Sequence, residues 1–136
     1  GGRKRPAHRG ITCGKPSTAG ILGRKLGKNN RVVAEQRVGR KFPNMRVLNS
    51  YWVNQDSTFM WYEVVCVDPM HKTIRNDPRV NWAVNAVHKH REARGLTSAG
   101  RKHRGMRHKG HKASKLRPSR RAAWRRNNKM TFLRKR

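Results

Sequence analysis

The distribution of charge along the chain constrains its fold more than any other feature. Of the 136 residues, 35 are Lys or Arg and 6 are Asp or Glu, which gives a formal net charge of +29. The net charge is +11 over residues 1–41, +1 over residues 42–90 and +17 over residues 91–136. Because a compact chain with this charge repels itself, it needs a polyanion to supply counter-charge. The sequence therefore predicts a nearly neutral folded centre between two basic arms, with nucleic acid as the polyanion.

The near-neutral centre contains the residues that can build a core, including seven of the nine aromatic residues. Arg46–Val53 and Phe59–Val67 have the composition of strands, and the five polar residues between them predict an antiparallel hairpin. Both faces of the second strand are apolar, so we expect helices, further strands or RNA to cover it. The aromatic side chains expected in this core, rather than on a base-stacking platform, are Tyr51, Trp52, Trp61 and Tyr62.

Three short helices are predicted around the hairpin. The first covers residues 30–40, with Asn29 or Asn30 as its cap. The pair Asp68-Pro69 is a start signal for a second helix over residues 70–76, and a third is predicted over residues 88–94, closed by Gly95. The expected fold class is therefore α+β: a small, mainly antiparallel sheet with short packed helices, flanked by long basic extensions.

The two arms differ from the centre in pattern as well as in charge. From Leu96 to Ser119 there is no apolar periodicity, and glycines fall at equal spacing among basic residues. Such a stretch is typical of a segment that is disordered until a ligand orders it. The chain is thus predicted to have three parts. They are a basic N-terminal arm with one short helix (1–41), a near-neutral α+β core (42–90) and a basic C-terminal extension rich in Gly, Arg and His (91–136).

Catalysis and metal binding are not favoured by this composition. An acid–base nuclease needs paired groups in a pocket, whereas the six acids are scattered along the chain. Five histidines lie close enough in sequence to suggest an ion, but their neighbours are Arg and Lys, which oppose a cation. We therefore expect no enzyme activity, no metal site and no small-molecule substrate. The histidines weighed for the metal alternative are His88, His90, His103, His108 and His111.

The cysteines and the hydropathy pattern point to an intracellular protein. Cys13 and Cys66 are far apart and do not form a secreted disulfide framework. We expect Cys66, within an apolar run, to be an inert thiol in the core. No stretch of about eighteen apolar residues and no signal-peptide segment occurs, so we expect a soluble chain without a membrane partner.

Several strings are more specific than composition. Those that carry a resemblance are Gly1-Gly2-Arg3-Lys4-Arg5-Pro6, Arg46–Val53, Asp68-Pro69 with His71-Lys72, His88–Glu92, Gly95–Lys102 and Ser119–Arg126. In order and along essentially the whole chain, they resemble the archaeal and eukaryotic large-subunit ribosomal proteins of the L-fifteen-e family. The match is weakest over Ser17–Leu26 and Asn127–Arg136. Members of that family have a further N-terminal region that includes a strand, so we expect this chain to be truncated or split.

The resemblance implies a structural constituent of the large ribosomal subunit that binds and stabilises folded ribosomal RNA through its basic extensions. The implied partners are large-subunit ribosomal RNA and neighbouring large-subunit proteins. The implied location is the cytoplasmic ribosome, with the nucleolus during assembly if the source is eukaryotic. No cofactor is expected beyond Mg²⁺ associated with the bound RNA. The alternative is a chromatin or other non-ribosomal nucleic-acid-binding protein, whose tails would be richer in Lys and Ala.

The residues expected to bind RNA combine charge with backbone freedom. Each Lys or Arg on a phosphate releases counterions, and Arg can bridge phosphates or stack on a base. Glycine lets the backbone bend sharply and approach RNA closely. Trp124 has two readings: it stacks on a base, or it covers a hydrophobic spot on a short helix. The predicted RNA-binding set is Arg3, Lys4, Arg5, Lys15, His88, Lys89, His90, Arg91, Arg94, Gly95, Thr97, Ser98, Gly100, Arg101, Lys102, Arg104, Gly105, Arg107, Lys109, Gly110, His111, Lys112, Ser119, Arg120, Arg121, Trp124, Arg125 and Arg126.

Overall fold

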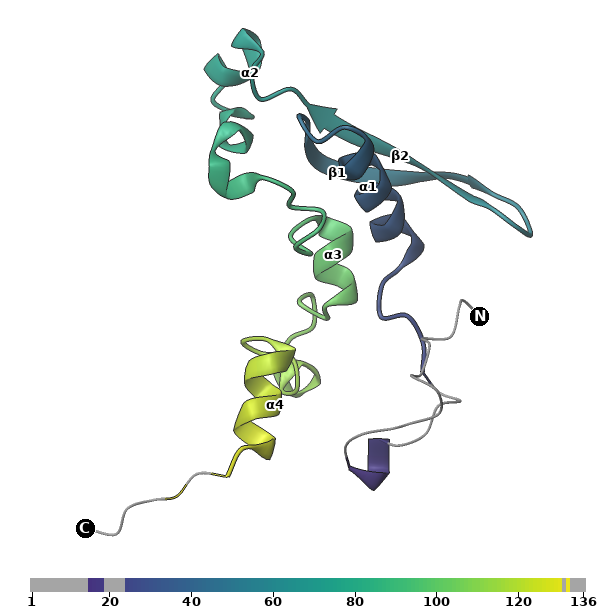
Figure 1. Cartoon of the computed structure of the whole chain (residues 1–136), viewed down its shortest axis with the longest axis vertical. Helices are drawn as coiled ribbons and strands as arrows, with labels where there is room; N and C mark the ends of the chain where they lie inside the picture. Colours follow the sequence, from purple (N-terminus) through teal and green to yellow (C-terminus); the bar gives the residue numbers. More distant parts are fainter. Residues whose placement is uncertain (1–14, 19–23, 131, 133–136) are drawn as a thin grey trace.

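A hairpin and a helix form the upper end of an elongated molecule. The computed structural model describes residues 15–18, 24–130 and 132. Helix α1 lies against the hairpin of β1 and β2, α2 lies at the top, and α3 and α4 follow one another below (Figure 1). The expected α+β class, with an antiparallel sheet and short helices, is confirmed. None of the helices in the described ranges is long and apolar enough to cross a membrane.

The hairpin forms where the sequence predicted it, with a first strand that ends two residues later and a second strand that begins one residue later than expected. Strand β1 (Arg46–Gln55) pairs antiparallel with β2 (Met60–Val67). The turn is closed by Asp56, whose Oδ1 accepts hydrogen bonds from the N–H groups of Phe59 at 2.6 Å and Thr58 at 2.7 Å. These two bonds, that from Phe59 first, lower the pKa of the Asp56 carboxyl. The polar connection between the strands is shorter than predicted, because Asn54 and Gln55 belong to β1.

Helix α1 (Asn30–Lys41) confirms the first predicted helix and fixes its cap. The Oδ1 of Asn29 accepts a hydrogen bond from the N–H of Val32 at 2.9 Å, as expected of a capping Asn. The face that α1 turns inward carries Val32, Glu35 and Gly39, all of which are buried. Helix α1 packs against both strands and also contacts α3.

A buried carboxylate joins three segments that are distant in sequence. Glu35 on α1 has 0% exposure. Its Oε1 accepts a hydrogen bond from the Ser50 hydroxyl on β1 at 2.6 Å, and its Oε2 accepts one from the Thr97 hydroxyl at 2.7 Å. Arg31 supports the same point, since its Nε donates to the Ser50 hydroxyl at 2.8 Å. We call Glu35, Ser50 and Thr97 the carboxylate hub.

The central aromatics are more exposed than predicted. Tyr51, Trp52 and Trp61 are 51%, 54% and 47% exposed, so the expectation that they are core residues is wrong for this part of the chain. Tyr62 is half-buried. Only the first half of β1 contains buried residues, and the tip of the hairpin extends past α1 (Figure 1). A two-stranded sheet covered by one short helix can bury only the part of its surface that the helix spans.

Two of the predicted helices differ in the structure. Helix α2 (Lys72–Asn76) begins after His71, whose ring accepts the capping hydrogen bond from Thr73. The Asp68 carboxylate instead accepts from the N–H of Met70 at 2.9 Å, so Asp68-Pro69 forms a turn before the helix. The helix expected over residues 88–94 does not form, and turns occupy residues 89–95 instead. Two short 3-10 helices, η2 (Asn81–Val84) and η3 (Ala86–His88), are followed by turns that end at Gly95, which has φ +68°.

The stretch from Leu96 to Ser119 contains helical elements in the structure, although its sequence shows no apolar periodicity. That a ligand orders this segment stays a prediction. The segment contains α3 (Ser98–His103) and the 3-10 helix η4 (Gly110–Ala113), and α4 (Arg120–Asn128) follows. The hydroxyls of Thr97 and Ser119 cap α3 and α4. The buried apolar side chains there are alanines, at Ala99, Ala113 and Ala123, so a search for large apolar residues does not find them. Helices α1 and α3 both pack on the sheet, so contacts connect the predicted centre with both predicted arms. The division at residues 41 and 91 stays a prediction based on charge.

The thiol of Cys66 is half-buried on β2. Burial raises the pKa of this thiol, and the negative charges of Glu92 and Glu35 raise it further. A thiol with a raised pKa holds little thiolate at neutral pH and reacts slowly. This supports the expectation of an inert thiol, although the side chain is only partly enclosed.

Glu35→Ala is expected to destabilise the free protein by about 2 kcal/mol, because it leaves two buried hydroxyls without their acceptor. Urea unfolding followed by circular dichroism measures the loss. The matched control is Glu63→Ala on the exposed surface of β2, which is expected to have little effect. Equal effects of the two substitutions would contradict a central role for the carboxylate hub.

Gly100→Ala is expected to destabilise the protein by roughly 1–3 kcal/mol through overpacking. A Cβ at Gly100 would lie 2.6 Å from the Cα and the carbonyl carbon of Gly95, and backbone atoms cannot easily move away. Gly27→Ala is the control, because a Cβ there has nothing within 4 Å. The measurement is the midpoint of thermal unfolding, and an unchanged midpoint for Gly100→Ala would exclude this contact as a constraint.

Candidate nucleic-acid interface

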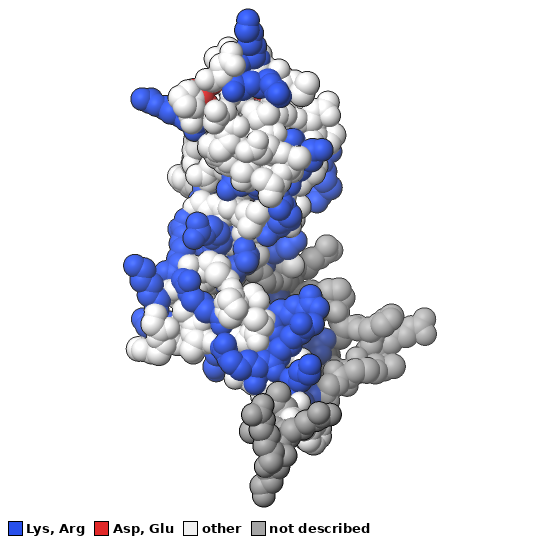
Figure 2. Space-filling view, turned by 90° about the vertical axis from the view of Figure 1, so that its left-hand side faces the viewer, with Lys and Arg blue, Asp and Glu red and all other residues white. Residues whose placement is uncertain are grey.

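Positive charge is concentrated on the lower half of the molecule. Lys and Arg gather over the region of α3 and α4, whereas on the upper part of the same face they are sparser and lie mainly at the top and edges (Figure 2). Within residues 91–130 the only acid is Glu92, which is 3% exposed and whose Oε1 lies 2.9 Å from Nδ1 of His90. Its Oε1 would also lie 2.0 Å from a Cβ at Gly39, so it faces the protein interior. The exposed cations of this region therefore have no exposed carboxylate beside them in the described part of that segment.

Some of the predicted RNA-binding cations are used inside the protein. Arg94 donates to the carbonyl oxygens of Val87 at 2.5 Å and Lys89 at 2.8 Å, which holds the loop before α3. The Arg91 guanidinium lies 4.8 Å from the centre of the Trp82 ring, a cation–π contact. Burial lowers the pKa of Arg91, and the neighbouring charge of Arg94 adds to this effect. These arginines shape the surface as well as charging it.

The histidines also make contacts within the protein. His88 lies edge-on to the Trp82 ring at 5.1 Å, and its Nδ1 is 2.7 Å from the Trp82 carbonyl oxygen. Burial lowers the pKa of His103, and the positive charge of Lys28 lowers it further. In the described ranges no three His, Cys, Asp or Glu side chains gather as a metal site would require.

The predicted glycines serve the fold more than an approach to RNA. Gly95, Gly105 and Gly110 have φ values of +68°, +72° and +64°, which agrees with the expected sharp bends. Gly95, Gly100 and Gly105 are buried, however, and a Cβ at Gly105 would lie 2.3 Å from Leu116. Gly110 is exposed and has nothing within 4 Å of its Cβ position. Gly110 therefore leaves room for RNA to approach the backbone closely, whereas Gly95, Gly100 and Gly105 pack against other parts of the protein.

Thr97 also belongs to the interior rather than to the interface. It is 1% exposed, and its hydroxyl donates to Glu35 while accepting from the N–H of Gly100. Ser98 and Ser119 are half-buried, and each lies at the start of a helix.

Exposed cations remain on α3, on η4 and on the connection between them. Arg101, Lys102, Arg107, Lys109 and Lys112 are exposed, as is His111, and Arg104 is half-buried with a hydrogen bond to the Gly95 carbonyl oxygen at 3.1 Å. Lys89 is exposed on the loop before α3, and Lys15, from the other end of the chain, donates to Asn128 on α4 at 2.7 Å. The predicted contacts at Arg3, Lys4 and Arg5 lie outside the described residues.

A hollow beside α3 brings several of these cations together with apolar side chains. It has a volume of about 530 Å³, and its apolar lining is Leu96 and Met106, both half-buried. Ser98 also lines it. Its basic lining residues are Arg91, Arg101, Arg107, Lys109 and Arg117. We call this feature the α3 hollow; sequence reasoning missed its apolar residues and Arg117, although Arg117 lies in the same basic run.

Helix α4 presents an aromatic ring among arginines. Trp124 is 62% exposed, so within the described chain it does not cover a hydrophobic spot, and stacking is the reading that the geometry favours. A hollow of about 290 Å³ beside it is lined by Lys115, Arg120, Ala123, Asn127 and Asn128. The other arginines of the helix, Arg121, Arg125 and Arg126, are exposed, and Arg126 donates to the carbonyl oxygens of Ser114 and Arg117.

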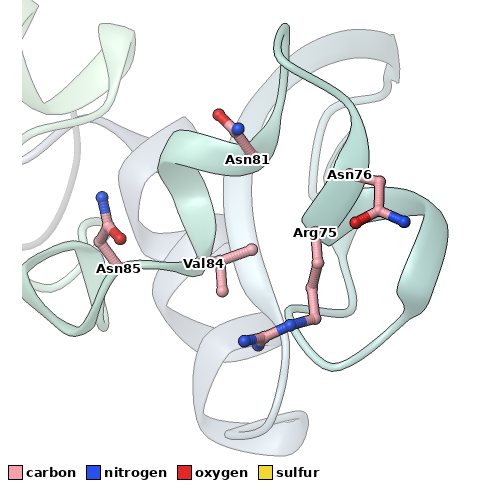
Figure 3. Close-up of a pocket in the computed structure, with 5 residues that line it drawn as sticks. All are labelled: Arg75, Asn76, Asn81, Val84 and Asn85. Atoms are coloured by element: carbon pink, nitrogen blue, oxygen red, sulfur yellow. The ribbon is translucent and has the colours of Figure 1, made fainter.

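A further pocket lies at the upper end of the molecule, where the sequence suggested no site. It has a volume of about 450 Å³ and is lined by three amide side chains, Val84 and one cation, Arg75. The labelled side chains come from α2, η2 and the residue after η2, and they point in different directions rather than toward one centre (Figure 3). With a single cation and no convergence, this pocket offers less to a polyanion than the α3 hollow does.

The sequence model of the ribosomal L15e family, described as Ribosomal L15, matches residues 1–123. The chain belongs to this family. Relatives of this L15e chain include large ribosomal subunit protein eL15y of Picea mariana, 60% identical over 134 residues, which are 98% of this chain and 66% of the relative. The protein eL15 of Tetrahymena thermophila is 60% identical over 92% of this chain and 61% of the relative, and eL15B of Saccharomyces cerevisiae is 54% identical over 98% and 65%. The chain spans about two thirds of the length of the curated relatives it matches.

The arginines of this L15e chain are expected to separate into two groups by their effect on stability. Arg94→Ala removes two hydrogen bonds to loop carbonyls and should destabilise the free protein by about 1 kcal/mol. Arg121→Ala, at an exposed position of α4, should change stability by less than about 0.5 kcal/mol. Guanidinium chloride unfolding of both variants provides the comparison, and equal losses would contradict the division.

Proposed function

We propose that this chain is a structural constituent of the large ribosomal subunit that binds and stabilises folded ribosomal RNA through its basic surface. The observation that carries the proposal is the surface of α3, η4 and α4, where exposed Lys and Arg have no exposed acid among them in the described residues. Membership of the L15e family supports it, as do the names of the relatives, each called a large ribosomal subunit protein. The role is structural and not enzymatic.

The chemistry of binding is the replacement of counterions by fixed cations. RNA carries condensed counterions that are released when Lys or Arg meets a phosphate, so many weak contacts sum to a large, salt-dependent affinity. Such contacts set the position and orientation of the RNA and carry little base information. The exposed arginines of α3 and α4 supply planar forks for phosphate, and Gly110 leaves room for the backbone of a partner to approach.

The proposed partners are large-subunit ribosomal RNA and neighbouring large-subunit proteins, and the proposed place is the ribosome in the cytoplasm, with assembly in the nucleolus in a eukaryote. Mg²⁺ enters only with the RNA, as the counterion of its folded form. The proposed RNA-binding set keeps the basic residues of the sequence prediction together with Ser98, Gly110, Ser119 and Trp124. It leaves out Thr97, Gly95, Gly100 and Gly105, because they are buried.

The affinity of the chain for large-subunit ribosomal RNA is expected to fall steeply with salt. If about ten cations meet phosphate, the logarithm of the affinity falls with a slope of roughly −7 to −9 against the logarithm of the salt concentration. Filter binding across a salt series measures this slope. A slope of about −2 would contradict binding through the basic surface.

Duplex DNA at matched salt is the control for a chromatin-type protein, since the two polyanions offer similar charge and different shape. Tighter binding to ribosomal RNA than to DNA is expected, because folded RNA is recognised by shape and by its 2′-hydroxyls as well as by phosphate. A preference for DNA would favour the non-ribosomal alternative.

A further inference from the structure

We propose that the α3 hollow binds one unpaired nucleotide of RNA, with the base on its apolar lining and the adjoining phosphates on its cations. The inference rests on the proposed function, since it names the form of RNA that one part of the basic surface takes. It adds a pocket for a single nucleotide to a surface otherwise described by its charge.

The cations of the hollow fit phosphate because they have no carboxylate among them. All five charged lining residues are basic, and the nearest acid in sequence, Glu92, is buried and turned toward His90 and Gly39. Arg101 and Lys109 are exposed at the hollow, so their charges are available to a ligand. A ligand that neutralises this cluster must carry more than one negative charge, as two successive phosphates of a strand do.

Three of the arginines are held in place by the protein itself. Arg107 donates to the Ser98 hydroxyl, and Arg117 donates to the carbonyl oxygens of Met106 at 3.3 Å and His108 at 3.2 Å. Arg91 lies over the Trp82 ring and donates to the Leu96 carbonyl oxygen at 3.1 Å. Each of these hydrogen bonds uses one end of a guanidinium that has five N–H donors, so donors remain for a ligand. Side chains that are already ordered lose less entropy on binding.

The apolar lining distinguishes a nucleotide from a simple anion. Leu96 and Met106 are half-buried and line the same hollow as the five cations. An inorganic anion gains nothing from these two side chains, whereas the face of a base is apolar and polarisable, and a Met thioether packs well against an aromatic ring. The combination of cations with an apolar lining is the chemistry of a phosphate joined to a base.

The size of the hollow selects one nucleotide rather than a helix. A volume of about 530 Å³ lies within the range of roughly 300–1,000 Å³ typical of pockets for small organic ligands. A base that is paired and stacked in a duplex cannot enter such a space, whereas bases in bulges and loops can be splayed out of the strand. Lys102, Lys112 and Arg121 are also exposed, but they are not among the residues that line the hollow.

The wall of the hollow is fixed to the core of the protein. Thr97, between Leu96 and Ser98, is bound to the buried Glu35 carboxylate at 2.7 Å. Gly100 on α3 packs directly on the backbone of Gly95. The lining residues Leu96, Ser98 and Arg101 therefore lie on a segment whose position is set by α1 and the hairpin, which gives the hollow a defined shape.

The test compares two RNA hairpins that differ by one unpaired adenosine in the stem, using fluorescence anisotropy with the full chain. We expect the bulged RNA to bind about fivefold more tightly than the fully paired RNA, which corresponds to about 1 kcal/mol. The double variant Arg101→Ala with Lys109→Ala is expected to lose this preference. Arg121→Ala with Lys112→Ala removes the same two residue types outside the hollow and is expected to keep it.

The two double variants should weaken binding to the paired RNA alike, lowering the salt slope by about 2 each, because each removes two cations. Met106→Ala should reduce the preference for the bulged RNA without changing the salt slope. Because this substitution leaves every charge in place, an unchanged preference for the bulged RNA would contradict the role of the apolar lining. Urea unfolding checks that the variant folds.

Each remaining outcome has a defined meaning. If the wild type binds both RNAs equally and with a steep salt dependence, the nucleotide pocket is wrong and the proposed function stands. If it binds neither RNA, the proposed function fails. Adenosine monophosphate should compete weakly, because its single phosphate neutralises only part of the charge of the five basic lining residues. Stronger competition by this nucleotide, or by a polyglutamate peptide, than by the bulged RNA would overturn the assignment to an RNA strand.

Discussion

The buried carboxylate of Glu35 is the contact on which the arrangement of the chain depends. It connects α1 to β1 through Ser50 and to the start of α3 through Thr97, three segments with few other large buried side chains. Burial of a carboxylate is costly in most proteins. Here the cost is offset by two short hydrogen bonds to hydroxyls and by the positive potential of a chain with a net charge of +29. In a strongly basic protein, a buried carboxylate that accepts hydrogen bonds from two segments can thus stabilise the fold.

The sequence predicted the elements whose signals are local and failed where structure depends on distant packing. Asn29 caps α1, and strands rich in β-branched and aromatic residues form the hairpin; both signals lie within a few residues of what they specify. The exposure of Trp52 and Trp61 depends on how far α1 reaches along the sheet, which the hairpin sequence does not encode. Helix α3 was missed because its buried face consists of Ala99 and Gly100, which resemble linker residues in composition.

For the basic residues, too, the sequence predicts one property and not another: it predicts where charge is concentrated, but not which arginines make hydrogen bonds inside the protein. Counting charges locates the cationic region correctly, because exposed Lys and Arg of α3, η4 and α4 do gather on one part of the molecule. It cannot tell that Arg94, Arg117 and Arg126 donate to backbone carbonyls of irregular segments. In a chain with little regular structure, such carbonyls lack partners from helices and strands, and arginine side chains supply them. One residue type therefore both holds the loops and charges the surface.

The small size of the buried side chains has a consequence for the free protein. In the part of the chain that the structure describes, the buried apolar residues are Val32, Val47, Ala83, Ala99, Ala113 and Ala123, so each contributes little transfer free energy. A ligand that binds only the folded form adds stability in proportion to the logarithm of its concentration over its dissociation constant. If the chain binds ribosomal RNA as proposed, its folded fraction rises with the supply of that RNA, and copies made in excess of the supply open more often. Those copies are the ones that proteases reach first, which ties the amount of folded protein to the amount of its partner.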